Sequence, residues 1–317
     1  MTGPRFDPTS RFSAAEMAQL RARSDVRGIF CVVHAWAVIG ASMALFALWP
    51  SPLTFIIAVV LIGSRQLGLA ILMHDAAHGV LVDSRRLNDP LSQWLCAFPV
   101  FADTIPYRHY HLVHHRRTQQ ADDPDLHLSA KFPITRASFR RKLIRDITGQ
   151  TGYKQRRAQI RAALGKPGDG FAARLATFRR KLGGPLLANL VLLALLTAFG
   201  KPHYYLMFWL LPLLTWQQVV TRIRNIAEHA MVPDNDDPMR NARTTYANWW
   251  ERALFAPYWV NYHVDHHLLF YVPCYNLPKL HAMLLEKGLG PKMEIKQTYA
   301  EVLRLAASKP ERAAQAA

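Results

Sequence analysis

Four long apolar stretches constrain the fold of this 317-residue chain more than any other feature. Each approaches the roughly 20 residues that an α-helix needs to cross about 30 Å of hydrocarbon. Very short links join the first stretch to the second and the third to the fourth, which predicts two tight hairpins. The stretches are residues 29–49, 53–73, 182–199 and 203 to about 220. We therefore expect an all-α integral membrane protein with four transmembrane helices in two hairpins.

Charge is distributed unevenly around these stretches. The chain holds 39 Lys and Arg against 22 Asp and Glu, a net charge of +17, and such a balance ordinarily suggests nucleic-acid binding. However, 37 of the basic residues and all the acidic ones lie in segments 1–28, 74–181 and 221–317. Cytoplasmic segments of membrane proteins are enriched in Lys and Arg in this way. We expect a multi-pass protein of a bacterial inner membrane, with both termini and a helical cap in the cytoplasm and no nucleic-acid partner.

Several further expectations concern the organisation of the chain. Residues 136–181 alternate basic clusters with apolar side chains, as helices on a membrane surface do. Arg65 lies in the second stretch, about 180° around the helix from His74 at 100° per residue, so we expect its side chain to extend to the membrane surface. The first 28 residues contain no apolar core of a signal peptide, so we expect no cleavage there. The predicted divisions are an N-terminal segment, 1–28, a main domain, 29–281, and a C-terminal tail, 282–317.

Eight of the 14 histidines occur in short motifs at or beyond the cytoplasmic ends of the predicted helices. The first motif is an i,i+4 pair, which places both imidazoles on one face of a helix. The pattern H-x-x-H-H then occurs twice, and its i, i+3 and i+4 spacing again brings rings onto one face. Coincidence explains two copies of so specific a pattern poorly. The motif residues are His74, His78, His111, His114, His115, His263, His266 and His267.

A fourth element lies just beyond the last apolar stretch, where Asn225 and His229 are one helical turn apart. With it, nine imidazoles and one amide meet on the predicted cap. This number exceeds the three or four ligands of a zinc site and suffices for two metal ions. Imidazole suits Zn, Cu, Fe and Ni, so the ligand type leaves the metal open. The other histidines fall outside the pattern, and we expect them not to be ligands: His34, His109, His127, His203 and His281.

These motifs resemble the three histidine boxes of the membrane fatty acid desaturase superfamily. The resemblance extends from residue 29 to about residue 281 and implies a non-haem diiron centre held by the box histidines. It further implies that His229 and Asn225 supplement the boxes, with Asn225 acting through a water molecule as in structurally known relatives. No catalytic residue beyond the metal centre is implied. The matching segments are His74-Asp-Ala-Ala-His78-Gly79, His111-Leu-Val-His114-His115, Asp122-Asp123-Pro124-Asp125, Asn261-Tyr-His263-Val-Asp-His266-His267 and Val272-Pro273.

The resemblance implies an oxidoreductase that uses O2 as co-substrate and two iron ions to form a cis double bond in a fatty acyl chain. The chain would be carried as an acyl-lipid, an acyl-CoA or an acyl-carrier substrate. Cys31, Cys96 and Cys274 form no cluster and no haem-binding segment is visible, so we expect a separate ferredoxin or cytochrome b5-type electron donor. Candidate contacts for an anionic head group are Arg108, Arg116 and Arg117.

Two other functions remain open at this point. The H-D-x-x-H-G motif and the Asp-rich run also resemble carotenoid ketolases of the same superfamily, so the scaffold could hydroxylate or ketolate a carotenoid or another lipid. A non-enzymatic metal-binding or metal-transport protein is the third reading, but transporter ligands usually lie at mid-bilayer rather than at helix ends. Asp75 and Asp265 lie inside the boxes and are either acceptors for ligand imidazoles or surface acids.

Overall fold

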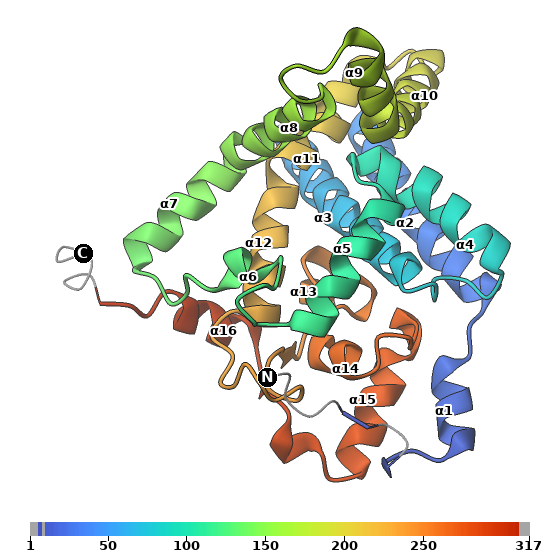
Figure 1. The fold of residues 1–317 in the computed structure, drawn as a ribbon. Coiled ribbons are helices and arrows are strands. Elements are labelled where there is room, and N and C mark those ends of the chain that lie inside the picture. The colour runs from blue at the N-terminus through green and yellow to red at the C-terminus, as the bar shows by residue number, and fades with distance from the viewer. Residues whose placement is uncertain (1–5, 8–9, 311–317) are drawn as a thin grey trace.

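The structure is a computed structural model that describes residues 6–7 and 10–310. It is almost entirely helical, as Figure 1 shows. The first predicted hairpin consists of α2 (Asp25–Leu48) and α3 (Pro52–Ala77). The Ser51 hydroxyl accepts a hydrogen bond from the backbone N–H of Thr54, and a proline occupies the first helical position. Both features favour a helix start at this point, so each of the first two apolar stretches forms one continuous helix.

Three helical stretches are long and apolar enough to cross a membrane. The second is central to the fold, because 61% of the residues in its most apolar window are buried, against 28% and 22% in the others. The third begins before the predicted residue 182, since α9 (Phe171–Phe178) continues through the π-helical turn η4 (Arg179–Gly183) into α10 (Gly184–Ala198). The three stretches are Ala14–Leu48, Pro52–Ala77 and Phe171–Ala198. The chain is therefore a helical membrane protein by length and composition.

The fourth apolar stretch is not one continuous helix. It consists of η5 (Tyr205–Leu210) and α11 (Leu211–Leu214), and the chain then breaks before α12 (Trp216–His229). The break is at Thr215, whose φ of −117° and ψ of −88° lie outside the helical region. The π-helical turn and a proline at position 212 both disturb the regular hydrogen bonding just before the break. A fourth crossing of the membrane therefore stays a prediction.

Arg65 does not extend to the membrane surface, and that expectation was wrong. Its side chain is only 5% exposed, and its guanidinium donates a hydrogen bond to the carbonyl oxygen of Ala253. The position of Arg65 on the face opposite His74 follows from helix geometry. That face is covered by α13 (Trp249–Leu254) and the η6 turn (Pro257–Trp259) rather than by lipid.

Residues 136–181 form α7 (Arg136–Ile147) and α8 (Gln150–Ala163) ahead of α9, and the expected position of α7 and α8 on a membrane surface stays a prediction. Between them Gly149 has φ +78°, a conformation that favours glycine. Gly152 lies directly against the backbone of Leu214, where a Cβ atom would come within 2.6 Å of the carbonyl oxygen. Large apolar side chains are exposed along both helices, among them Ile144, Ile147, Tyr153 and Ile160.

The remaining elements are short, and several of them contact α3 (Figure 1). They include one short parallel strand pair, in which Thr244 pairs with Ile295 and Thr245 with Lys296. The elements are α1 (Ala14–Arg21), α4 (Arg85–Ser92), η2 (Gln93–Ala97), η3 (Phe98–Val100), α5 (Thr104–Arg117), α6 (Leu126–Ser129), β1 (Thr244–Thr245), α14 (His263–Leu268), η7 (Cys274–Asn276), α15 (Leu277–Glu286), η8 (Gly290–Lys292), β2 (Ile295–Lys296) and α16 (Tyr299–Ala306).

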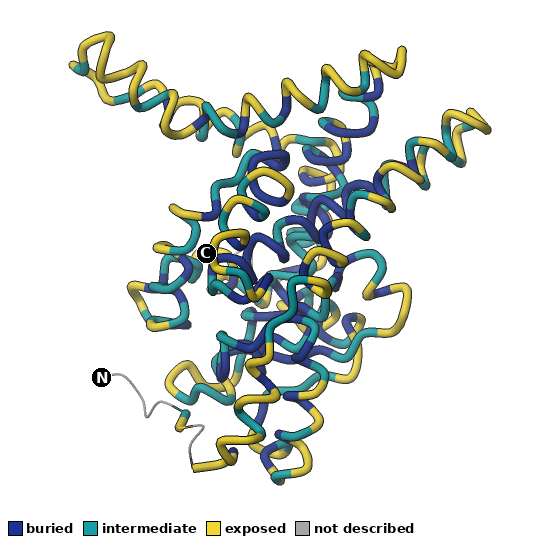
Figure 2. The backbone as a smooth tube through the Cα atoms, turned by 90° about the vertical axis from the view of Figure 1, so that its right-hand side faces the viewer, coloured by how far each residue is buried: buried dark blue, intermediate teal, exposed yellow. Residues whose placement is uncertain are grey.

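Buried residues are concentrated where these helices meet. Figure 2 shows exposed residues along the helical segments that project outward and buried residues in the middle of the molecule. The main hydrophobic core joins α2 and α3 to α14 and α15, through residues such as Leu72, Ala76, Val264 and Leu280. This core fixes the end of α3 relative to α14, the two elements that carry the first and third histidine motifs.

Candidate metal centre

The nine predicted histidines converge at the C-terminal end of α3. His74 lies in the last turn of α3 and His78 is its C-cap. The last two turns of α5 carry three histidines, α14 carries three, and His229 is the last residue of α12. Side chains three and four residues apart share a helix face, so each helix presents its imidazoles in one direction. Segments that are far apart in the sequence thereby form one cluster.

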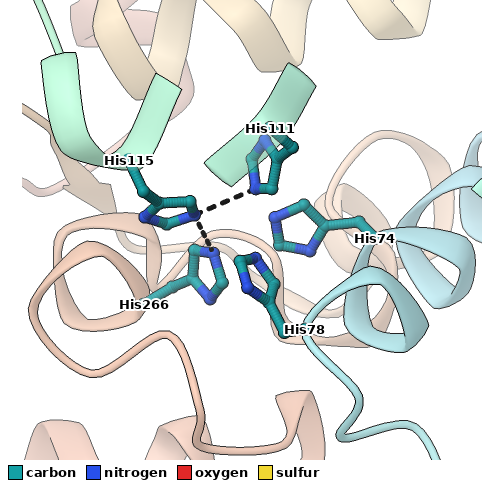
Figure 3. A group of neighbouring side chains, drawn as sticks. All are labelled: His74, His78, His111, His115 and His266. Atoms are coloured by element: carbon teal, nitrogen blue, oxygen red, sulfur yellow. Dashed lines mark hydrogen bonds between the residues drawn. The ribbon is translucent and has the colours of Figure 1, made fainter. Parts of the chain in front are cut away.

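Five of these imidazoles form the larger group, which we call the five-histidine group (Figure 3). One ring nitrogen from each residue lies within 4.8 Å of the corresponding nitrogens of the others. The Nε2 atom of His115 lies 2.9 Å from that of His111 and 3.0 Å from that of His266. The members are His74, His78, His111, His115 and His266. Five nitrogens that face one small volume are a suitable donor set for one metal ion.

The other four imidazoles lie beside the first group, and we call them the four-histidine group. The ring nitrogens of His114, His229 and His267 lie within 4.8 Å of one another. His263 joins them, because its Nε2 atom lies 2.8 Å from that of His229 and 3.2 Å from that of His267. All nine predicted histidines are thus divided between two adjoining groups, and among the described residues none of the other five histidines belongs to a metal-ligand group.

Asn225 lies beside the four-histidine group. It lines a small cavity of about 30 Å³ together with His114, His229 and His263. A cavity of this volume can hold a water molecule, because one water molecule needs roughly 10–15 Å³ of the same kind of volume. The surroundings of Asn225 are therefore compatible with a contact to a metal ion through water.

Buried nitrogens without partners indicate that the site suits a cation. Both ring nitrogens of His74 and both of His78 are buried and have no hydrogen-bond partner, although buried polar atoms are nearly always paired. Burial also holds the pKa of six imidazoles well below the ordinary histidine value, which favours the neutral ring that a metal ligand requires. The six are His111, His115, His229, His263, His266 and His267. Iron is among the metals that such a set of nitrogen donors fits.

Asp123 orients one ligand candidate and was not singled out for this role from the sequence. Its Oδ1 atom lies 2.8 Å from Nδ1 of His114, and its side chain is only 1% exposed. Such a contact sets the tautomer and leaves Nε2 free for a metal ion. The signal was present in the Asp-rich run that follows the second motif, but that run contains three carboxylates, and which of them is buried depends on the fold.

The two acids inside the boxes have different surroundings. Asp75 accepts a hydrogen bond from the backbone N–H of Cys274, 2.8 Å away, and its other oxygen lies 3.8 Å from Nδ1 of His74. Asp265 is fully buried and contacts His281 and Thr244. Neither is a surface acid, and neither makes a hydrogen bond of normal length to a member of the two groups.

Glu228 is a second residue that the sequence motifs did not indicate. Its carboxylate pairs with Arg224 at 2.6 Å and lies 3.5 Å from Nε2 of His263. Burial raises the pKa of Glu228 to about 7, while the guanidinium of Arg224 opposes this rise. The carboxylate belongs to a possible ligand set with His229 and His263. The position of Glu228 beside His263 is visible only in the folded structure, where the end of α12 lies against α14.

Two arginines secure the ends of the helices that carry ligand candidates. Arg108 donates hydrogen bonds to the last carbonyl groups of α3, at Ala76 and Ala77, and also pairs with Asp89. Arg243 is fully buried, donates to the carbonyl oxygen of Met231 just beyond α12, and pairs with Glu294. Carbonyl groups at helix ends have no partner within the helix, so these contacts hold both ends in place. Arg108 is therefore an internal support rather than a free contact for a head group.

A much larger cavity lies on the other side of Tyr258 from the histidines. Its volume is about 830 Å³ and its lining is mainly apolar and aromatic. Tyr258 also lines a second, very small void together with His74, His263 and His266. The Tyr258 ring thus stands between the large cavity and the histidine cluster. The large cavity therefore adjoins the histidine cluster across this one side chain.

Comparison with known proteins identifies the family to which the chain belongs. Residues 47–298 match the fatty acid desaturase family. A dihydrorhizobitoxine desaturase of Bradyrhizobium elkanii is 29% identical over 284 residues, covering 85% of this chain and 78% of that protein. A probable fatty acid desaturase of Sorghum bicolor is 27% identical over 275 residues, covering 80% and 67%. Because the family match extends over most of the sequence and includes all three histidine motifs, the chain belongs to the fatty acid desaturase family.

Proposed function

We propose that the protein catalyses O2-dependent desaturation of a fatty acyl chain at a diiron centre, with formation of a cis double bond. The observation that carries this proposal is the pair of adjoining histidine groups next to a large, mainly apolar cavity. Two bound irons would supply the activation of O2 that no protein side chain provides. The cavity would hold the chain, and Tyr258 would separate it from the metals.

The division of the imidazoles suggests how two irons would be held. The five-histidine group would hold one ion, and the four-histidine group would hold the other. Asn225 would complete the second set through a water molecule in the cavity that it lines. Asp123 would orient the ring of His114 through a contact with its Nδ1 atom. Thr118 would orient the ring of His267 in the same way. The protein would thus contribute ligation, position and exclusion of bulk water.

The names of the relatives bear on the reaction and on the substrate. Both are named as desaturases, which favours desaturation over hydroxylation or ketolation of a lipid. One is named for dihydrorhizobitoxine rather than for a fatty acid, so a substrate other than an acyl chain is the second candidate. An acyl substrate would arrive on a lipid, on coenzyme A or on a carrier protein.

We further propose that the protein lies in a bacterial inner membrane with both termini and the metal centre on the cytoplasmic side. The concentration of Lys and Arg outside the hairpins supports this orientation. A separate ferredoxin or cytochrome b5-type protein would supply electrons. Its docking would be favoured by the excess of Lys and Arg in the segments outside the hairpins, because electrostatic complementarity accelerates association with an acidic partner.

Expression in an iron-replete host that lacks this activity tests the proposal. We expect mass spectrometry of the host lipids to reveal a new unsaturated acyl chain, and the purified protein to hold two irons per chain. The variant His266→Ala should give no product, since it removes a member of the five-histidine group. The matched control is His127→Ala, which removes an exposed histidine outside both groups. An unchanged lipid profile with iron-loaded protein would refute the acyl substrate, and the same product from His266→Ala would refute the site.

A further inference from the structure

The large cavity has a positively charged lining as well as an apolar one. It is enclosed by α2, α3, α13 and the η6 turn, and none of the described residues that line it is Asp or Glu. Arg27 and Arg252 are exposed at its rim, whereas Arg65 is buried in its wall. A cleft lined by charge of one sign and low-dielectric walls concentrates ligands of the opposite sign. An anionic ligand is therefore the kind that this cavity favours.

Arg65 is buried and has no counter-ion among the described residues. A guanidinium has five N–H donors, yet the polar contacts of Arg65 are with the carbonyl oxygen of Ala253 and with Tyr258. Its Cζ atom lies 5.7 Å from the centre of the Tyr258 ring. No ion pair between described residues includes Arg65. A charge that is 5% exposed and unpaired is costly unless an anion accompanies it.

Two polar side chains, Tyr258 and His34, accompany Arg65 in the wall of the cavity. The hydroxyl of Tyr258 lies 3.1 Å from Nδ1 of His34, and both residues line the cavity. Tyr258 also borders the void beside His74, His263 and His266. A ligand held by Arg65 would therefore rest against the residue that separates the cavity from the metal centre. Along α3, nine residues separate Arg65 from His74, which corresponds to about 13 Å.

We propose that Arg65 binds the carboxylate of the substrate, with His34 and Tyr258 beside it, so that the substrate is an unesterified carboxylic acid in place of the three carried forms named above. A guanidinium can bind a carboxylate through two parallel hydrogen bonds, which suits a buried and otherwise apolar wall. The identification of the ligand as a substrate rests on the proposed desaturase function. The carboxylate can belong to a fatty acid from the bilayer or to a shorter, soluble acid.

Binding measurements on the purified full-length protein in a non-ionic detergent test the proposal without any requirement for turnover. The probes are dodecanoate and dodecanol for a membrane-borne ligand, and hexanoate and hexanol for a soluble one. Tryptophan fluorescence reports binding, because Trp249 and Trp259 line the cavity. We expect one of the two acids to bind about tenfold or more tightly than its alcohol, as charge-assisted hydrogen bonds predict. The length that binds better identifies the source of the carboxylate.

Substitutions then assign the preference to Arg65. In Arg65→Gln the acid should bind no better than the alcohol, while binding of the alcohol stays unchanged. Arg65→Lys keeps the charge but loses the forked geometry, and should retain part of the preference. Arg86→Gln removes an exposed arginine elsewhere and should behave as the unaltered protein. Equal binding of acid and alcohol by the unaltered protein, or an intact preference in a folded Arg65→Gln, would overturn the proposal. Because iron is not needed for binding, either result is separate from a failure to desaturate.

Discussion

Asp122 and Asp123 are neighbouring carboxylates with opposite surroundings. The side chain of Asp122 is 63% exposed and pairs with Arg117 at the surface, whereas that of Asp123 is 1% exposed and contacts His114. Contacts that orient a metal-binding imidazole commonly affect metal affinity as strongly as some ligands do. The two residues therefore form a matched pair in which only one contacts a ligand candidate.

We expect Asp123→Asn to weaken iron binding by about 10–100-fold, because the amide no longer holds the His114 ring as a carboxylate does. Asp122→Asn should bind iron as the unaltered protein does. Iron per chain, measured after dialysis against graded concentrations of a chelator, distinguishes the two. Equal retention of iron by both variants would contradict the assigned role of Asp123.

At the level of single residues, the sequence predicted some positions much better than others. The nine histidines could be identified because helical spacing places them on common faces wherever the helices lie. Asp123 and Glu228 could not be identified, because their roles depend on which surfaces α5, α12 and α14 bury against each other. Arg65 was placed on the correct face of α3, but its environment depends on α13, which lies far away in the sequence.

At the level of elements, α8 crosses the broken fourth stretch at Gly152. A Cβ atom there would come within 2.7 Å of Cα and 2.6 Å of the carbonyl oxygen of Leu214. Gly40 in α2 provides a comparison, since nothing lies within 4 Å of its Cβ position. Both glycines are inside helices, so substitution by alanine improves the helix propensity equally at the two sites.

We expect Gly152→Ala to be less stable than Gly40→Ala by about 1–3 kcal/mol, the usual cost of forcing an extra group into a packed contact. The midpoint of thermal denaturation in detergent measures the difference. Equal midpoints for the two variants would indicate that α8 does not pack on α11 as described.

The breaks in the elements were harder to predict than the elements themselves. Long apolar stretches have few alternatives to a helix in a membrane, so α2, α3 and α10 followed from length and composition. Pro212 is the one signal in the sequence near the interruption at Thr215, and a proline alone does not tell whether a helix bends or breaks. The interruption also lets α12 take its own direction, so that His229 reaches α14.

At the level of the whole molecule, the two histidine groups join four elements that are distant in the sequence. Metal that binds only the folded state stabilises it by an amount that grows with the free metal concentration, about 2.7 kcal/mol at roughly 100 times the Kd. We expect chelation to lower the midpoint of thermal denaturation and added Fe(II) to restore it. His127→Ala should respond in the same way, whereas His266→Ala should respond much less. An identical response in His266→Ala would mean that the added metal acts elsewhere.

The orientation in the membrane can be tested with single cysteines, since the three native ones are buried. We expect Lys201→Cys, in the link between the last two apolar stretches, to react with a membrane-impermeant maleimide in intact cells. Lys309→Cys, near the C-terminus, should react only after the cells are opened. Labelling of position 309 in intact cells would exclude the proposed orientation.

The C-terminal ends of three helices contribute to the electrostatics of the histidine cluster. Helices α3 and α12 carry their ligand candidates at their C-terminal ends and α5 carries its own in its last two turns, so three C-termini lie near the same place. The aligned peptide dipoles give each of these ends about half a negative charge. The backbone therefore favours a cation at this centre in addition to the ligation that the imidazoles provide. A variant that lacks one histidine, such as His266→Ala, would lose that ligand and keep this contribution of the backbone.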